Sequence, residues 1–131
     1  MKRQLKKILY VEDEADIRLI VQIALEDVGG FELKSCSSGL EAIAEVEDFE
    51  PDLILLDVMM PGLDGPATLK ELHKLPAVKK IPVIFMTARI QEKEIAQYKE
   101  LGIKDIISKP FEPLSLPDTL REFWSHYESE S

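Results

Sequence analysis

The sequence has a single cysteine, Cys36, and only two histidines among its 131 residues. One cysteine cannot form a disulfide within the chain, and nothing in the sequence resembles the Cys and His clusters that bind zinc. No apolar run is long enough to span a membrane. The apolar residues 8–11, which follow a basic start, are too few for a signal peptide. We therefore expect a cytoplasmic protein without membrane insertion.

Positive charge is scarce as well. The chain carries 16 Lys and Arg residues against 25 Asp and Glu residues, which gives a formal net charge of −9. This balance argues against a direct nucleic-acid partner, because nucleic-acid surfaces need basic side chains for the phosphates. Hydrophobic residues make up 45% of the chain, as in globular proteins. The length predicts a single domain over residues 1–127, followed by a short acidic tail at residues 128–131.

Two apolar runs in the sequence end in carboxylates. Residues 53–56 lead to Asp57, and residues 7–11 lead to Glu12 and Asp13. Unbroken runs of this length are typical of strands buried on both faces of a parallel sheet. An Asp after a strand is by itself more often a turn former or a helix cap. If the two strands are neighbours, however, three carboxylates crowd together, and Mg²⁺ or Mn²⁺ is the simplest cation to neutralise them.

Two further apolar runs end in other polar groups. The run from Ile81 ends in the hydroxyl of Thr87, and the run from Asp105 ends in the ammonium of Lys109. A hydroxyl donor, a fixed ammonium, a metal ion and an accessible carboxylate together suit a phosphoryl group. In this interpretation Asp57 is the nucleophile, while Lys109 and the metal neutralise the phosphoryl oxygens.

Strands and helices are predicted to alternate five times along the chain. This alternation predicts a parallel sheet covered on both faces, because parallel neighbours need crossover connections. The helices are expected at Ala15–Val28, after Ser37-Ser38-Gly39, at Pro66–Leu75, at Gln91–Leu101 and from near Leu116. The apolar face of the first helix is predicted to comprise Ile17, Ile20, Val21, Ala24, Leu25 and Val28.

Short motifs stand at the ends of the apolar runs in a definite order. They are Glu12-Asp13, Asp57, Met60-Pro61-Gly62 with Asp64-Gly65, Thr87-Ala88 and Lys109-Pro110-Phe111. Each motif is weak alone, but the ordered set resembles the receiver domain of bacterial two-component response regulators, in particular a stand-alone receiver of the chemotaxis type. The resemblance covers nearly the whole chain. It implies an α/β, flavodoxin-like, doubly wound fold, with a five-stranded parallel sheet in the order 2-1-3-4-5 and helices on both faces.

The resemblance also implies a metal site. Asp13 and Asp57 would bind Mg²⁺ (or Mn²⁺) directly, and Glu12 would hold the ion partly through water. The backbone carbonyl of Met59 would complete the ligands that the protein supplies. All of these ligands are oxygen atoms, which hard divalent cations prefer.

Three residues take catalytic roles by the same resemblance. Asp57 would be the phosphoacceptor, Thr87 the switch hydroxyl that moves toward the phosphate, and Lys109 the cation that bridges to it. The peptide bond between Lys109 and Pro110 is expected to be cis.

The function implied is a phosphorylation-dependent signalling switch rather than a metabolic enzyme. A sensor histidine kinase or a phosphotransfer protein would donate the phosphoryl group, and the domain would assist its own phosphorylation and dephosphorylation. A downstream protein target would then bind the changed surface. We expect a monomer or a weak dimer. If the chain is a piece of a longer protein, the output domain could be a DNA-binding domain, a nucleotide cyclase or a kinase.

Two alternatives remain open. The first is a receiver-like interaction module that works without phosphorylation. The second is an aspartyl-phosphate phosphatase of the haloacid dehalogenase kind, which ranks far behind because that class needs an acid where Met59 stands.

The sequence departs from the receiver pattern at three positions. Ile106 stands where many receivers have a switching Tyr or Phe, so coupling to the surface would have to use another route, for which Tyr98 is a candidate. Met59 and Arg89 occupy the variable rim of the pocket, and neither can act as a base for water. We therefore expect the phosphoryl group to be lost slowly.

Overall fold

The computed structural model describes residues 3–88 and 91–130. Its centre is one five-stranded sheet in which all neighbouring strands run parallel, in the order β2-β1-β3-β4-β5. This is the topology that the resemblance implied. The strands are β1 (Lys7–Val11), β2 (Glu32–Cys36), β3 (Leu53–Asp57), β4 (Val83–Thr87) and β5 (Asp105–Ser108).

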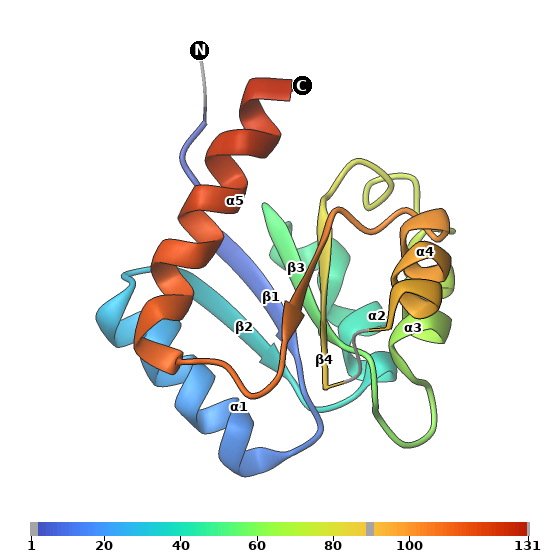
Figure 1. Ribbon diagram of the computed structural model, residues 1–131, viewed down its shortest axis with the longest axis horizontal. Helices are drawn as coiled ribbons and strands as arrows, with labels where there is room; N and C mark the ends of the chain where they lie inside the picture. Colours follow the sequence, from blue (N-terminus) through green and yellow to red (C-terminus); the bar gives the residue numbers. More distant parts are fainter. Residues whose placement is uncertain (1–2, 89–90, 131) are drawn as a thin grey trace.

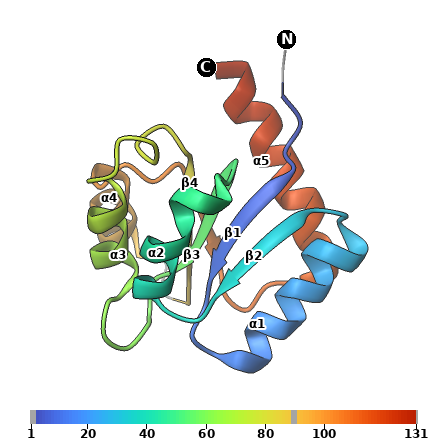
Figure 2. The same cartoon turned by 180° about the vertical axis from the view of Figure 1, so that it is seen from behind.

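Helices cover both faces of the sheet, as Figures 1 and 2 show from opposite sides. Helices α1 and α5 lie on one face, and α2, α3 and α4 lie on the other. The helices are α1 (Ala15–Gln22), α2 (Gly39–Phe49), α3 (Gly65–Leu72), α4 (Glu92–Glu100) and α5 (Leu116–Glu130). Every residue of β3 and β4 is buried, because central strands between two helix layers have no face left for water.

The sheet divides the hydrophobic core into two clusters. Successive side chains of a strand point to opposite faces. Leu9 and Val11 of β1 therefore join the cluster under α2, α3 and α4, while Ile8 and Tyr10 join the cluster under α1 and α5. Since all strands run parallel, their carboxyl ends lie at one edge of the sheet.

The first helix differs from the sequence prediction. α1 ends at Gln22 and continues as one π-helical segment, η1 (Ile23–Val28), in which Gly29 N–H donates to the carbonyl of Ala24. The wider turn shifts the later side chains around the axis, so the face predicted at a period of 3.6 residues is not kept. Val28, predicted on the buried face, is 55% exposed. Ile20, also predicted on that face, lies in α1 before the wider turn and is 48% exposed, so its prediction was wrong for a reason other than the π-helical turn.

The last helix begins where the proline pattern predicted. A short 3₁₀ turn, η2 (Pro113–Ser115), leads into α5, which starts at Leu116 and holds Pro117 in its first turn. A proline fits there because the first helical N–H groups have no partner within the helix. Residues 128–130 of the expected acidic tail continue this helix. Within the described ranges, no helix has the length and apolar character needed to cross a membrane.

Candidate functional site

The carboxylates of β1 and β3 meet at the carboxyl edge of the sheet. β1 pairs with β3 so that Val11 lies opposite Leu56, and the next residues along each strand are Glu12 and Asp57. One carboxylate oxygen from each of Glu12, Asp13 and Asp57 lies within 4.8 Å of the others. The two strands are therefore neighbours, and the three carboxylates crowd together as the sequence predicted for that case.

Lys109 follows β5, the edge strand two places away from β3, and its side chain reaches back to this acidic cluster. β4 pairs with β5 so that Thr87 lies opposite Ser108, and the backbone N–H of Lys109 donates to the Thr87 carbonyl at 2.9 Å. Its ammonium Nζ lies 2.8 Å from Glu12 Oε1 and 3.0 Å from Asp57 Oδ1. The Lys109–Pro110 peptide bond is cis, as expected. One cation thus bridges two buried carboxylates.

Burial and charge shift the protonation equilibria of this pair. Burial of the Asp57 carboxyl raises its pKa from 3.8 to about 6; the hydrogen bond from Lys109 opposes that rise, and the charge of Glu12 adds to it. For Lys109, burial lowers the pKa, but the hydrogen bonds to Glu12 and Asp57 outweigh it and the net direction is upward. The Lys109 ammonium therefore keeps its proton, whereas burial makes the Asp57 carboxyl harder to ionise than it is in water.

The donor set fits a divalent cation that prefers oxygen ligands. Asp13 Oδ1 is buried and has no hydrogen-bond partner within the described part of the chain. The cluster holds three carboxylates, of which Glu12 and Asp57 contact the Lys109 ammonium, so negative charge exceeds that one positive charge when all three are ionised. Mg²⁺ takes carboxylate oxygens and keeps several waters, which suits a pocket at the edge of a sheet.

Two contacts at Glu12 were not predicted from the sequence. The phenol of Tyr10 donates to Glu12 Oε1 at 3.3 Å, and Arg18 Nη1 donates to the backbone carbonyl of Glu12 at 2.8 Å. The only sequence signal for the first is a phenol in the apolar run Ile8–Val11, two residues before Glu12 and hence on the same face. The signal for the second is a basic residue one turn into α1.

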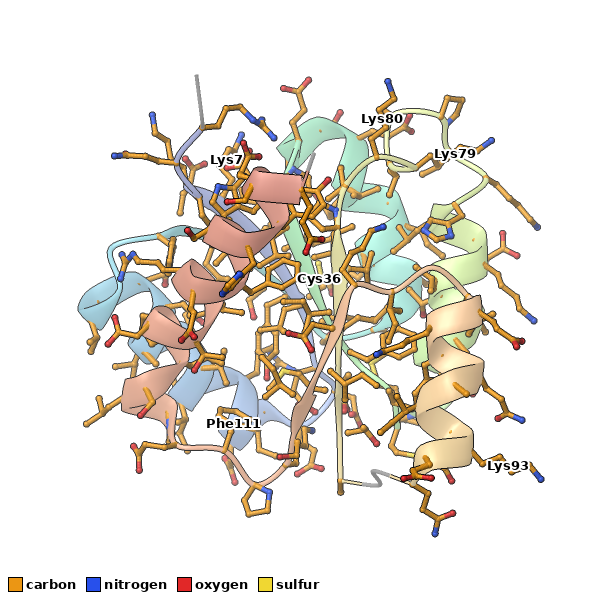
Figure 3. All side chains as sticks on the ribbon, turned by 45° about the horizontal axis from the view of Figure 1, so that its top comes forward. Lys7, Cys36, Lys79, Lys80, Lys93 and Phe111 are labelled. Carbon is orange, nitrogen blue, oxygen red and sulfur yellow. The ribbon has the colours of Figure 1, made fainter. Side chains whose placement is uncertain are left out.

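The other predicted site residues lie around the rim. Thr87 is buried at the end of β4, whereas the side chain of Met59, two residues beyond Asp57, is 62% exposed. Arg89 lies outside the described residues. Figure 3 shows Phe111, two residues after Lys109, at the end of the molecule opposite Lys79 and Lys80.

Ile106, which stands where many receivers have a switching aromatic residue, is half-buried on β5. Tyr98 of α4 instead meets Phe85 of β4 edge to face, with ring centroids 5.1 Å apart. Phe85 is fully buried, and it lies two residues before Thr87 on the same strand. This pair connects the strand that carries Thr87 to α4.

The family model described as "Response regulator receiver domain" matches residues 8–121 of this chain. The chain belongs to this family. It is a signalling domain of two-component systems, and the resemblance drawn from the ordered motifs is confirmed.

Curated relatives of the receiver agree with this family. The phosphate regulon transcriptional regulatory protein PhoB of Pseudomonas aeruginosa is 40% identical over 116 residues, which are 88% of this chain and 50% of the relative. The alkaline phosphatase synthesis transcriptional regulatory protein PhoP of Bacillus subtilis is 40% identical over 108 residues, 82% of this chain and 44% of the relative. The receiver thus spans about half the length of these relatives.

Solved structures share the fold over nearly their whole length. The chemotaxis protein CheY4 of Vibrio cholerae has a TM-score of 0.85 at 29% identity, with 91% of this chain and 98% of that chain covered. A CheY-like receiver domain protein of Methanospirillum hungatei has a TM-score of 0.83 at 26% identity, covering 98% and 100% of the two chains.

Proposed function

We propose that this receiver is a phosphorylation-dependent switch that accepts a phosphoryl group on Asp57. The observation that carries the proposal is the position of Asp57, whose carboxylate lies 3.0 Å from the Lys109 ammonium and within the cluster formed with Glu12 and Asp13. A nucleophilic carboxylate beside a fixed cation and an oxygen-rich metal pocket suits phosphoryl transfer, which depends on positioning and charge neutralisation.

The chain's own groups would act on the reacting atoms as follows. One Asp57 oxygen forms the bond to phosphorus, while the bond from phosphorus to the donor's imidazole nitrogen breaks and the electron pair stays on that nitrogen. Lys109 is protonated and turns from the carboxylates to a phosphoryl oxygen. Thr87 lies at the end of β4, beside the strand that carries Asp57, and would donate a hydrogen bond to another phosphoryl oxygen.

Mg²⁺, or Mn²⁺, is the metal that we propose for the cluster. Asp13 and Asp57 would hold it directly, Glu12 partly through water, and the backbone carbonyl of Met59 would complete the set. Bound there, it would supply positive charge for the phosphoryl oxygens. The orphaned Asp13 Oδ1 supports this assignment.

We propose that a sensor histidine kinase or a phosphotransfer protein donates the phosphoryl group. A downstream protein target would then bind the phosphorylated domain. The contact between Tyr98 and Phe85 offers a route from β4 to the surface of α4. Two of the relatives are transcriptional regulators by name, so a DNA-binding output domain elsewhere in a longer protein is one possible destination of the signal. The domain is proposed to act as a monomer or a weak dimer.

The test is the intact mass of the protein after incubation with acetyl phosphate and Mg²⁺. We expect one phosphoryl adduct, absent without the metal and absent in Asp57→Asn. Asp48→Asn removes the same charge at an exposed position of α2 and should keep the adduct. If folded wild-type protein that binds Mg²⁺ gains no adduct, the phosphorylation proposal is wrong, and a module that works without phosphorylation takes its place.

A further inference from the structure

Tyr10 is a polar residue in the middle of an apolar strand. It belongs to the core cluster under α1 and α5 and has no exposed surface. Its phenol nevertheless reaches the site, where it donates to Glu12 Oε1 at 3.3 Å. A phenylalanine would fill nearly the same space, so packing alone does not require the hydroxyl.

Glu12 depends on donors from the protein because its side chain has no exposed surface. Oε1 accepts from Lys109 Nζ at 2.8 Å and from Tyr10 at 3.3 Å, while Oε2 accepts from the backbone N–H of Glu14 at 3.3 Å. Lys109 is the closer of the two donors to Oε1. A buried carboxylate oxygen that loses its donors is strongly destabilised.

Lys109 cannot serve Glu12 and a phosphoryl group equally well. Its ammonium lies between Glu12 and Asp57, and phosphorylation of Asp57 would add oxygens that compete for it. When Lys109 turns to the phosphoryl group, Tyr10 is the protein donor that remains on Oε1 of Glu12 among the described residues.

We propose that Tyr10 is a positioning residue for phosphorylation: its buried hydroxyl keeps Glu12 Oε1 hydrogen-bonded and so allows Lys109 to move to the phosphoryl group. This inference rests on the proposed function of Asp57. Tyr10 touches neither the phosphoryl group nor the metal in this role; it acts through Glu12.

The test compares wild-type protein with Tyr10→Phe, using beryllium fluoride as the phosphoryl mimic at saturating Mg²⁺. Fluorine NMR would give the dissociation constant of the bound fluoride complex, and calorimetry would give that of Mg²⁺ alone. We expect Tyr10→Phe to weaken binding of the mimic about tenfold, the effect of one hydrogen bond to a charged group. The affinity for Mg²⁺ alone should change by less than about twofold, because Lys109 can then remain on Glu12.

Two controls separate this role from a structural one. Tyr127→Phe removes a phenol that donates to the Lys80 carbonyl, at the end of the molecule away from the site, and should leave both affinities unchanged. In a Glu12→Gln background, Tyr10→Phe should have little further effect, because the buried charge that needs the donor is gone.

Each result decides between the alternatives. Equal binding of the mimic by wild type and Tyr10→Phe would overturn the role of Tyr10 and leave the proposed function of Asp57 intact. An equal loss of affinity for the mimic and for Mg²⁺ alone would overturn it too, because it would indicate general damage to the pocket. A wild-type protein that binds Mg²⁺ but not the mimic would overturn the proposed function and this inference together.

Discussion

Replacing Asp57 by Asn should stabilise the metal-free protein. The wild-type pocket groups the carboxylates of Glu12, Asp13 and Asp57, and the Lys109 ammonium contacts Glu12 and Asp57. Asn keeps the size of the side chain and removes one buried negative charge. A substitution at the proposed phosphoacceptor is therefore expected to abolish phosphorylation and yet raise the free energy of unfolding.

The pKa of Asp57 sets the magnitude. A rise from 3.8 to about 6 means that ionising this carboxyl costs about 3 kcal/mol more in the folded than in the unfolded protein at neutral pH. That cost already includes the attraction to Lys109; because an amide satisfies the donors around the carboxyl less well, we expect a net gain of about 1–2 kcal/mol. For a chain of this length that corresponds to an increase in Tm of about 3–8 °C.

The gain should depend on pH in a definite direction. Above about pH 6 the Asp57 carboxyl is ionised in both states, and the wild type carries the full cost. As the pH falls from about 6 to 4, the folded wild type takes up a proton and recovers that stability. Below 3.8 the carboxyl is protonated in both states, so the advantage of Asn disappears.

Thermal unfolding in the presence of a chelator measures this effect. Wild type, Asp57→Asn and the exposed control Asp48→Asn would be followed from about pH 7.5 down to about pH 4.5. Added Mg²⁺ should stabilise wild type more than Asp57→Asn, because the variant lacks a ligand. The reasoning would be refuted if Asp57→Asn were less stable than wild type near neutral pH, or if its advantage did not shrink in acid.

Two further substitutions test the charge balance and the rim of the pocket. Lys109→Met leaves Glu12 and Asp57 without their cation and should lower the free energy of unfolding, measured in urea, by about 3–5 kcal/mol. Mg²⁺ should restore part of this loss, and an unchanged urea midpoint would contradict the ion-pair argument. Met59→Asn should speed loss of the phosphoryl group about two- to tenfold, because an exposed amide can orient water where the thioether cannot. Leu114→Asn, equally exposed on η2, is its control, and equal rates in Met59→Asn and wild type would show that Met59 does not shield the site.

Much of the site could be predicted from the sequence because Glu12, Asp57 and Thr87 end long apolar runs that form buried strands. Lys109 follows β5, a short strand whose residues are exposed or half-buried, and was predicted from its place in the ordered motifs. In a parallel sheet the residues after each strand must meet at one edge.

The first helix marks a limit of periodicity. Apolar spacing predicted a buried face through Val28, but the π-helical turn over Ile23–Val28 rotates the chain and leaves Val28 exposed. Spacing describes an ideal helix and does not encode the close packing at this helix end, where a Cβ on Gly29 would lie 2.8 Å from the Leu25 carbonyl oxygen.

The sequence by itself determined the alternation of strands and helices, the polar group that ends each central strand, and the excess of acid, because these depend on local residue order. Only the tertiary structure decided that Lys109 bridges Glu12 and Asp57 across a sequence separation of up to 97 residues, and that Tyr10 shares the same Glu12 oxygen. It also decided how deeply Asp57 is buried, and hence its pKa. Strand register, side-chain rotamers and solvent exclusion set these features, and they arise only when distant segments pack together.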